Sequence, residues 1–320
     1  MDDEKRITEF AIIHCLDRIK GFGPVKFRQI YETYRSFSAF WDVVTSKNYN
    51  LKSQPLNFDV KLQKNLMKQL NSLKKKLGES RNHIIEQMEK AKKLNGKLIS
   101  YFDKEYPINL YKTNQCVPIL YAAGNLDILR NEQCCAVVGT RKPSEWSIRE
   151  TKKAVEELIK QGYVIVSGLA KGIDAIAHET ALTFNAKTIS VLGCGVDVYY
   201  PKENQKLQDE IRQKGVIVSE YPFGARIQSI SLQKRDKIIV GLSKYVLIVE
   251  TSKKGGTMNA YRAAVEQKKP IGVFTPAHEI LGNFDGNIQI AKERKTKVYC
   301  FPKGEAVNFW SKADAQSFFI

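Results

Sequence analysis

The sequence predicts an α/β protein with a doubly wound, mostly parallel sheet and a small all-helical domain at its N-terminus. Two observations support this fold class. Up to about residue 95, apolar residues recur at three-and-four spacing, and from Lys97 onward the chain contains short runs rich in Val and Ile. Most of these runs are separated by stretches with helical spacing. Such alternation is typical of a parallel sheet with right-handed crossovers and helices on both faces.

The first domain is expected to span residues 1–95. Helical spacing occurs in ITEFAIIHCLDRI (7–19), KLQKNLMKQLNSLKKKLG (61–78) and HIIEQMEKAKKLNG (83–96), whereas the polar segment 45–59 is typical of a loop. Gly21 and Gly23 flank Phe22 in a turn between two helices, which resembles a helix-hairpin-helix (SAM-like) module. Their exposed amides could contact a DNA phosphate, or the glycines could serve only the turn.

The second domain is expected to span residues 96–305. Its strand candidates are KLISYF, ILYAAG, CCAVVGT, YVIVSG, TISVLG, GVIVSE, YVLIVE, PIGVF and KVYCF. These runs suit strands that are buried on both faces. Helices are predicted within 147–160, 172–184, 203–214 and 256–267, and a short tail, 306–320, follows.

The chain of 320 residues carries a net charge of +17, which favours a polyanionic partner: nucleic acid first, an anionic membrane surface second. Residues 51–100 hold 12 Lys and Arg against 4 Asp and Glu, which indicates either a binding surface or a solvated helix face. No apolar run has membrane-spanning length, and the first residues are too polar for a signal peptide. We therefore expect a cytoplasmic protein with no membrane partner.

Metal and cofactor chemistry find little support in the sequence. The six cysteines show no C-x-x-C spacing and the four histidines are far apart, so no zinc site and no cofactor are expected. Neither a P-loop nor a dinucleotide-binding fingerprint is present, which disfavours ATP hydrolysis and redox chemistry. Asp174 and His178 share a helix face and form either an acid–base pair or, as we favour, a brace for the preceding turn. The chain is thus not expected to be an enzyme.

Basic and glycine-rich segments follow three of the predicted strands, and a fourth basic segment precedes another strand. In open parallel sheets ligands bind at the carboxyl ends of the strands, so these segments together predict an anion-binding cleft. The candidate residues are Gly139, Arg141, Lys142 and Ser144; Ser167, Gly168, Lys171 and Gly172; Arg235 and Lys237; and Lys253, Lys254, Gly255, Gly256 and Thr257.

From Val137 to about Val273 the chain resembles the DNA-processing protein A (DprA/Smf) family. The resemblance rests on spaced identities that include Gly168-Leu169-Ala170, Gly172-Ile173-Asp174, Tyr200-Pro201, Gly241-Leu242-Ser243 and Val249-Glu250. It implies an extended Rossmann-like fold and a homodimer that binds single-stranded DNA, protects it during natural transformation and helps to load the recombinase RecA. By position, the basic pocket would include Arg141, Arg235 and Lys237, with Lys171 and Lys253 nearby.

The chain departs from the family pattern at the basic segment. Leu232-Gln233-Lys234-Arg235-Asp236-Lys237 stands where relatives usually have Phe-Pro-x-Arg-Asn-Arg. The Asp236 carboxylate should weaken phosphate binding unless it pairs with Arg235 or Lys237. Tyr221 and Phe223 could stack on bases, although packing beneath the loop is slightly favoured.

Two other readings of the second domain remain open. Lys254-Gly255-Gly256-Thr257 is similar to a loop of nucleotide phosphoribohydrolases, but Asn259 and Ala260 stand near where those enzymes carry a glutamate. A nucleotide-binding sensor, or a phosphoribohydrolase-like enzyme, is the first alternative. A structural oligomer whose basic surface only maintains solubility is the second.

Overall fold

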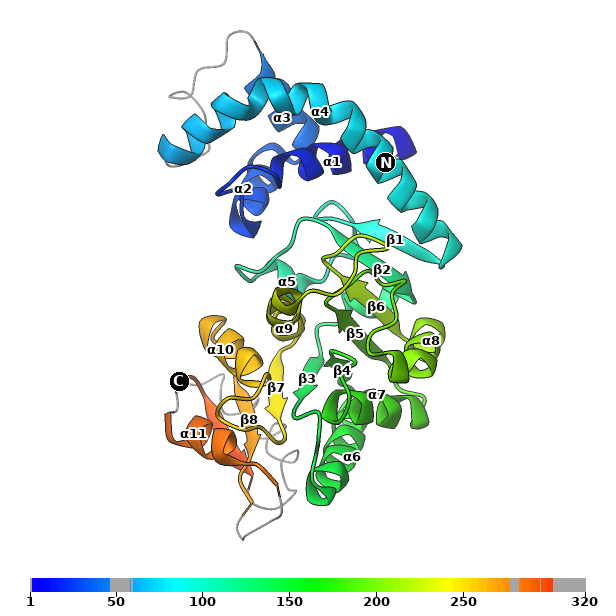
Figure 1. Ribbon diagram of the computed structural model, residues 1–320, viewed down its shortest axis with the longest axis vertical. Coiled ribbons are helices and arrows are strands. Elements are labelled where there is room, and N and C mark those ends of the chain that lie inside the picture. The colour runs from blue at the N-terminus through cyan, green and yellow to red at the C-terminus, as the bar shows by residue number, and fades with distance from the viewer. Residues whose placement is uncertain (1, 47–57, 59, 277–281, 294, 302–320) are drawn as a thin grey trace.

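The computed structural model describes residues 2–46, 58, 60–276, 282–293 and 295–301. The predicted loop at 45–59 and the predicted tail at 306–320 therefore lie largely or wholly outside the described residues. Figure 1 shows helices α1 to α4 gathered at one end of the molecule, beyond strand β1. Among the described residues, no helix combines the length and apolar character needed to cross a bilayer.

The helical region begins with α1 (Asp3–Leu16), α2 (Pro24–Tyr34) and α3 (Phe37–Thr45). The buried carboxylate of Glu9 joins two of these helices. It accepts hydrogen bonds from the backbone N–H groups of Phe37 (2.6 Å) and Ser38 (3.2 Å) and from the Ser36 hydroxyl (2.7 Å). A carboxylate at a helix N-terminus satisfies free donors and complements the helix dipole, so Glu9 of α1 fixes the start of α3.

Helix α4 (Val60–Lys93) is one continuous helix of 34 residues, where the sequence pattern predicted two helical segments on either side of Gly78. Gly78 is exposed, and a Cβ there would meet nothing within 4 Å. The apolar stripe that contains Leu62, Leu66, Leu70 and Leu73 continues into Ile84, so packing against the domain core carries the helix through the glycine.

All nine predicted strands are present and form one sheet. The strands are β1 (Gly96–Ile99), β2 (Leu120–Gly124), β3 (Cys134–Val138), β4 (Val164–Ser167), β5 (Thr188–Leu192), β6 (Val216–Ser219), β7 (Tyr245–Ile248), β8 (Ile271–Phe274) and β9 (Val298–Phe301). Their order is β1-β2-β6-β5-β4-β3-β7-β8-β9. Strands β1 and β2 pair antiparallel at one edge. The strands that follow in this order, β6-β5-β4-β3-β7-β8-β9, are parallel to one another.

The remaining helices cover the two faces of the sheet. They are α5 (Ile108–Tyr111), α6 (Glu145–Lys160), α7 (Ile173–Thr183), α8 (Gln205–Lys214), α9 (Ser229–Leu242), α10 (Met258–Glu266) and α11 (Asp285–Glu293), with 3-10 turns η2 (Leu126–Arg130) and η3 (Lys202–Asn204). Alternate residues of β3 enter different cores. Cys135 and Val137 pack with α6 and α7, whereas Cys134, Ala136 and Val138 belong to the core that includes α9 and α10. The mostly parallel, doubly wound α/β fold is thereby confirmed.

Buried polar contacts fasten the helical region to the sheet. Arg6 of α1 pairs with Asp103, with 2.5 Å between Nη1 and Oδ1, and also donates to the carbonyl of Leu98. Arg28 of α2 donates to the carbonyls of Tyr111 (2.7 Å) and Thr113 (2.8 Å). Because both guanidinium groups are largely buried, the helices and the sheet pack as one unit.

Candidate nucleic-acid interface

The strand order reverses between β3 and β7, and the loops that leave these strands open into adjoining pockets. From β3 the chain continues outward through β4, β5 and β6, and then returns to the other side of β3 as β7. A pocket of about 510 Å³ is lined by the loops after β3 and β7 and by the start of α9. A second pocket, of about 570 Å³, is lined by the loops after β4 and β5. Arg141, Ala170, Leu232 and Arg235 line both pockets, so we treat them as one groove.

Two glycines allow the loops around the groove to approach one another. A Cβ at Gly139 would press against the Ile173 side chain. Gly172 has φ +80° and lies so close to the backbone of Thr140 and Arg141 that a side chain would collide with it. The Ile173 N–H donates to the Thr140 carbonyl (3.2 Å). Gly139 and Gly172 therefore set the position of Arg141 through loop packing.

Ser144 and Ser167, two of the predicted phosphate contacts, hydrogen-bond inside the protein. Ser144 caps α6 by accepting from the Ser147 N–H, and its own N–H and hydroxyl each donate to Glu250 Oε2 at 2.9 Å. Ser167 is fully buried and donates to the Val137 carbonyl (2.7 Å). Neither serine lines the groove, so both act by holding the strand ends in place.

Glu250 is a structural residue of the site that the sequence analysis did not predict. It is buried directly after β7, and its backbone carbonyl accepts from the Thr140 N–H (2.8 Å). Its two carboxylate oxygens join Ser144 to the Asn283 N–H (2.9 Å). The sequence did contain a signal for this role: Glu250 stands at the end of an apolar run, and a buried carboxylate needs hydrogen-bond donors.

Arg235 lies at the floor of the groove and is only 6% exposed. Its Nη1 donates to the Gly168 carbonyl and lies 3.8 Å from Asp174 Oδ2, and its Nε lies 3.1 Å from Asp236 Oδ1. A Cβ at position 168 would overlap the guanidinium of Arg235, so only a glycine leaves room for it there. The charge of Arg235 is thus shared with two carboxylates, and of the two cations considered as partners of Asp236 it is Arg235 that pairs with it.

The carboxyl groups of this cluster titrate abnormally. Burial raises the pKa of Asp236 to about 6, although Arg235 opposes the shift. Burial also raises the pKa of Asp174, against Arg235 and the backbone hydrogen bonds from Ala170, Gly168 and Gly139. Asp174 therefore braces the turn after β4, as predicted.

His178, one helical turn beyond Asp174, belongs to the protein interior. It is fully buried, and Nδ1 lies 2.7 Å from the Thr188 hydroxyl. Burial lowers its pKa to about 3, so the ring is neutral at physiological pH. The arrangement of His178 and Asp174 is that of a packed core residue beside a structural carboxylate.

The predicted cations with free access to solvent are Arg141, Lys142, Lys171, Lys253 and Lys254, all of which are exposed. Arg141 forms no ion pair with any residue that the structure describes. Lys171 pairs with Glu203, with 2.6 Å between Nζ and Oε1. Both side chains of that pair are exposed, so water and salt screen it and Lys171 can exchange its carboxylate partner for a phosphate. Lys142, Gly255, Gly256 and Thr257 line the part of the groove near β7.

Lys237 is not part of this groove, which corrects the expected basic pocket. It lies two positions after Arg235 on α9, and a helix turns by roughly 200° over two residues. Its Nζ instead lies 3.3 Å from Glu266 Oε2, and the side chain lines a different pocket.

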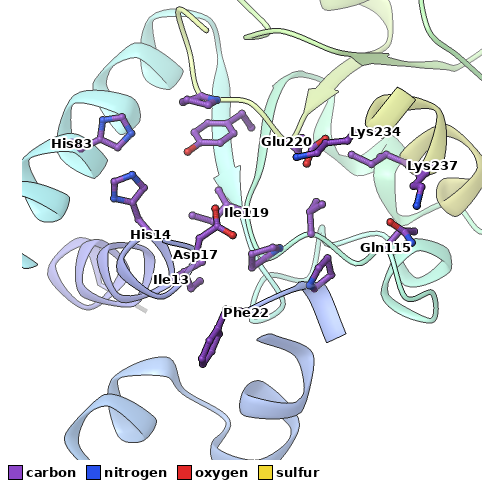
Figure 2. Close-up of a pocket in the computed structure, with 16 residues that line it drawn as sticks. Ile13, His14, Asp17, Phe22, His83, Gln115, Ile119, Glu220, Lys234 and Lys237 are labelled. Carbon is purple, nitrogen blue, oxygen red and sulfur yellow. The ribbon is translucent and has the colours of Figure 1, made fainter. Parts of the chain in front are cut away.

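That other pocket, of about 560 Å³, lies between the helical region and the sheet. Figure 2 shows His14 and His83 next to one another at one side of it and Glu220 beside Lys234. The two imidazoles stack at 4.7 Å, and burial, with a smaller effect of His83, lowers the pKa of His14 to about 4. Its basic and acidic side chains oppose one another, so the pocket offers no concentrated positive charge.

The predicted N-terminal contacts lie beside this pocket between the helical region and the sheet. Gly21 has φ +99° in the turn between α1 and α2, and Gly23 precedes Pro24 at the start of α2. Phe22, between the glycines, is buried and lines the pocket. The turn explains both glycines, and a DNA contact at Gly21 and Gly23 stays a prediction.

Aromatic residues near these loops either pack in the interior or line the groove. Phe223 is buried and packs edge-on against Tyr121, with 5.9 Å between ring centroids, as the favoured reading held. Tyr199 and Tyr200, which were not predicted as site residues, line the groove beyond β5. Tyr200 is 36% exposed and offers a surface on which a base could stack.

The model of the DNA recombination-mediator protein A family matches residues 97–303. The chain belongs to this family. It is 31% identical over 273 residues to the Smf protein of Synechocystis, a match covering 82% of this chain and 64% of that protein. It is 37% identical over 194 residues to the DNA processing protein DprA of Streptococcus pneumoniae, covering 61% and 68%.

Solved structures of DprA proteins share the fold. The X-ray structure from Streptococcus pneumoniae aligns with a TM-score of 0.63 at 30% identity and covers 72% of this chain and 80% of that one. The structure from Helicobacter pylori aligns with a TM-score of 0.60 at 27% identity, covering 70% and 97%. The latter was determined to explain how that DprA binds single-stranded DNA.

Proposed function

We propose that the groove binds single-stranded DNA and that the chain acts as a recombination mediator of the DprA type. The observation that carries the proposal is the position of Arg141. Its exposed guanidinium lies where the two halves of the groove meet and forms no ion pair with any described residue, although its charge acts weakly on the Asp236 carboxyl at the groove wall. A free arginine beside small residues and helix N-termini suits a phosphate backbone.

The rest of the groove supports an extended strand. Lys142 lies toward β7 and Lys171 toward β5, on opposite sides of Arg141, so cations follow the groove along its length. Tyr200 adds an exposed ring at the β5 end. Cations along phosphates with a stacking surface for bases are the usual means of binding single strands with little sequence preference.

The test is fluorescence anisotropy of labelled oligo-dT against the full chain. We expect Arg141→Ala to weaken binding by about 1–3 kcal/mol, and to reduce the slope of log affinity against log salt by about 1. Arg149→Ala is the matched control, because Arg149 is exposed on α6 outside the groove. Equal affinities of the Arg141 and Arg149 variants would refute the proposed groove.

The finer features of the proposal follow from the family. We propose that the protein forms a homodimer in the cytoplasm, protects single strands during natural transformation and assists RecA loading, without catalysing a reaction. Co-sedimentation with RecA on oligo-dT, with size-exclusion chromatography coupled to light scattering, would test the two partners. A monomer that leaves RecA assembly unchanged would remove this part of the proposal.

A nucleotide sensor is the second candidate, and one observation favours it. The half of the groove bounded by Tyr199, Tyr200 and Pro201 has a volume of about 570 Å³, which lies in the range of small-molecule sites. A mononucleotide that raises the melting temperature while oligo-dT fails to bind would select this candidate, or the related phosphoribohydrolase-like enzyme if the nucleotide is cleaved.

A further inference from the structure

The outer face of α4 carries a row of lysines that the proposed groove does not use. Lys61, Lys64, Lys68 and Lys75 are all exposed, and their spacings of three, four and seven residues place them on one side of the helix. At about 1.5 Å per residue, the row is roughly 21 Å long. None of the residues that line the groove comes from α1 to α4, so this is a separate surface.

These ammonium groups are not neutralised within the part of the chain that the structure describes. From Val60 to Gly78 the helix contains no Asp or Glu, and the four lysines form no ion pair with any described residue. Farther along α4 the pattern changes, since Lys90 pairs with Glu86 at 2.6 Å. Lys74, which lies off the row, donates to the Thr45 carbonyl (2.9 Å) and fastens α4 to α3.

The opposite face of the helix fixes the orientation of the row. Leu62, Leu66, Leu70 and Leu73 are buried in the core of the helical region, where α4 packs against α1. Rotating the lysines inward would expose these four side chains to water, which the hydrophobic effect opposes. The fold therefore presents the positive row to solvent, and Figure 1 shows α4 itself along the outer side of the helical end.

The chemistry of α4 specifies the kind of polyanion. The helix contains no Phe, Tyr or Trp, so it has no ring on which an unstacked base could lie. A row of lysines without rings suits contacts to phosphates more than to unstacked bases, and in a duplex the bases are already stacked on each other. We propose that Lys64, Lys68 and Lys75 form a second nucleic-acid surface, which contacts the phosphate backbone of double-stranded DNA independently of sequence.

The test compares two triple variants of the full chain that have the same net charge. The first is Lys64→Gln/Lys68→Gln/Lys75→Gln. The control is Lys152→Gln/Lys187→Gln/Lys206→Gln, which removes three exposed lysines outside the helical region. The probe is a short blunt-ended duplex of mixed sequence, and oligo-dT is measured in parallel by anisotropy.

We expect the α4 variant to lose roughly tenfold or more in duplex affinity at about 50 mM salt and to lower the salt slope by roughly 2–3, at about 0.9 per phosphate contact. The control variant should retain duplex affinity, and both should bind oligo-dT equally. Lys64→Arg/Lys68→Arg/Lys75→Arg should restore duplex binding, and matching circular dichroism melts will show that all variants fold.

Each of three other outcomes would overturn the proposal. Equal losses in both Gln variants would reduce the effect to net charge. Parallel losses of duplex and oligo-dT in the α4 variant would make the row an extension of the single-strand path. If the chain does not bind duplex at all, the α4 lysines contact either an acidic protein or only solvent. Because Arg141→Ala affects the groove alone, failure of the single-strand proposal is distinguished from failure of this one.

Discussion

The groove at the sheet and the outer face of α4 both carry positive charge, but they hold it differently. In the groove, Arg235 is buried between Asp174 and Asp236, and Lys171 pairs with Glu203. On α4, Lys64, Lys68 and Lys75 stand exposed on a stretch of helix without acids. The comparison teaches that the count of basic residues in a segment does not measure the charge available to a ligand. Burial and pairing decide how much of it remains.

The largest expected difference between the two regions is in stability. Arg235→Ala would leave Asp174 and Asp236 buried without their cation, so we expect the free energy of unfolding to fall by about 3–5 kcal/mol. Lys75→Ala removes only an exposed side chain and should change it by less than about 0.5 kcal/mol. Urea denaturation of both variants measures the contrast, and similar small losses would mean that Arg235 is not a structural cation.

A smaller effect is expected where the backbone makes room for Arg235. Gly168→Ala would push the guanidinium out of its site, and such overpacking costs about 1–3 kcal/mol. Gly256→Ala is the control, since Gly256 also borders the groove but has open space around it. Thermal melts that rank the two alanines equally would contradict the close fit of Arg235 against Gly168.

The smallest expected effect concerns the charge of the groove itself. The raised pKa of Asp236, about 6, means that its carboxylate is ionised above this pH and protonated below it. Affinity for oligo-dT should therefore rise as the pH falls through about 6. Asp236→Asn should bind roughly threefold to tenfold more tightly at neutral pH, a gain of about 1 kcal/mol, with a flatter pH profile.

Asp127→Asn is the control for this titration, because Asp127 is exposed outside the groove. His14 and His178, with pKa values of about 4 and 3, do not titrate near pH 6. A folded-state pKa above the usual 3.8 also means that the contribution of Asp236 to stability decreases as the pH rises from about 4 to 6. An unchanged pH profile in the Asn variant would contradict the assigned cluster.

The strands and the position of the groove could be predicted from the sequence because both depend on local composition. Runs such as YVIVSG are apolar along the strand, as strands covered on both faces must be, and this one ends in small residues at the loop. Basic residues then follow at the carboxyl ends, where ligands of parallel sheets bind. Arg141 and Lys171 do line the groove.

Other features depend on geometry that composition does not contain. Arg235 and Lys237 belong to one basic segment, but the helix sends them to different pockets. The sequence predicts Ser144 as a ligand contact, and only the fold brings Glu250, 106 positions away, to its hydroxyl. Gly78 suggested a helix end, yet the leucine stripe continues past it into Ile84. Helix geometry decided the first case, and long-range packing overrode local signals in the other two.

Helix α4 joins β1 through only two residues, Leu94 and Asn95. A connection this short allows little change in the position of α4 relative to β1. The buried ion pair of Arg6 and Asp103 is a second connection between the helical region and the sheet. The helical end is thus joined closely to the antiparallel edge of the sheet. The fold itself then sets the distance between the lysine row and the groove. A nucleic acid that bound both surfaces would therefore need a length that spans this distance.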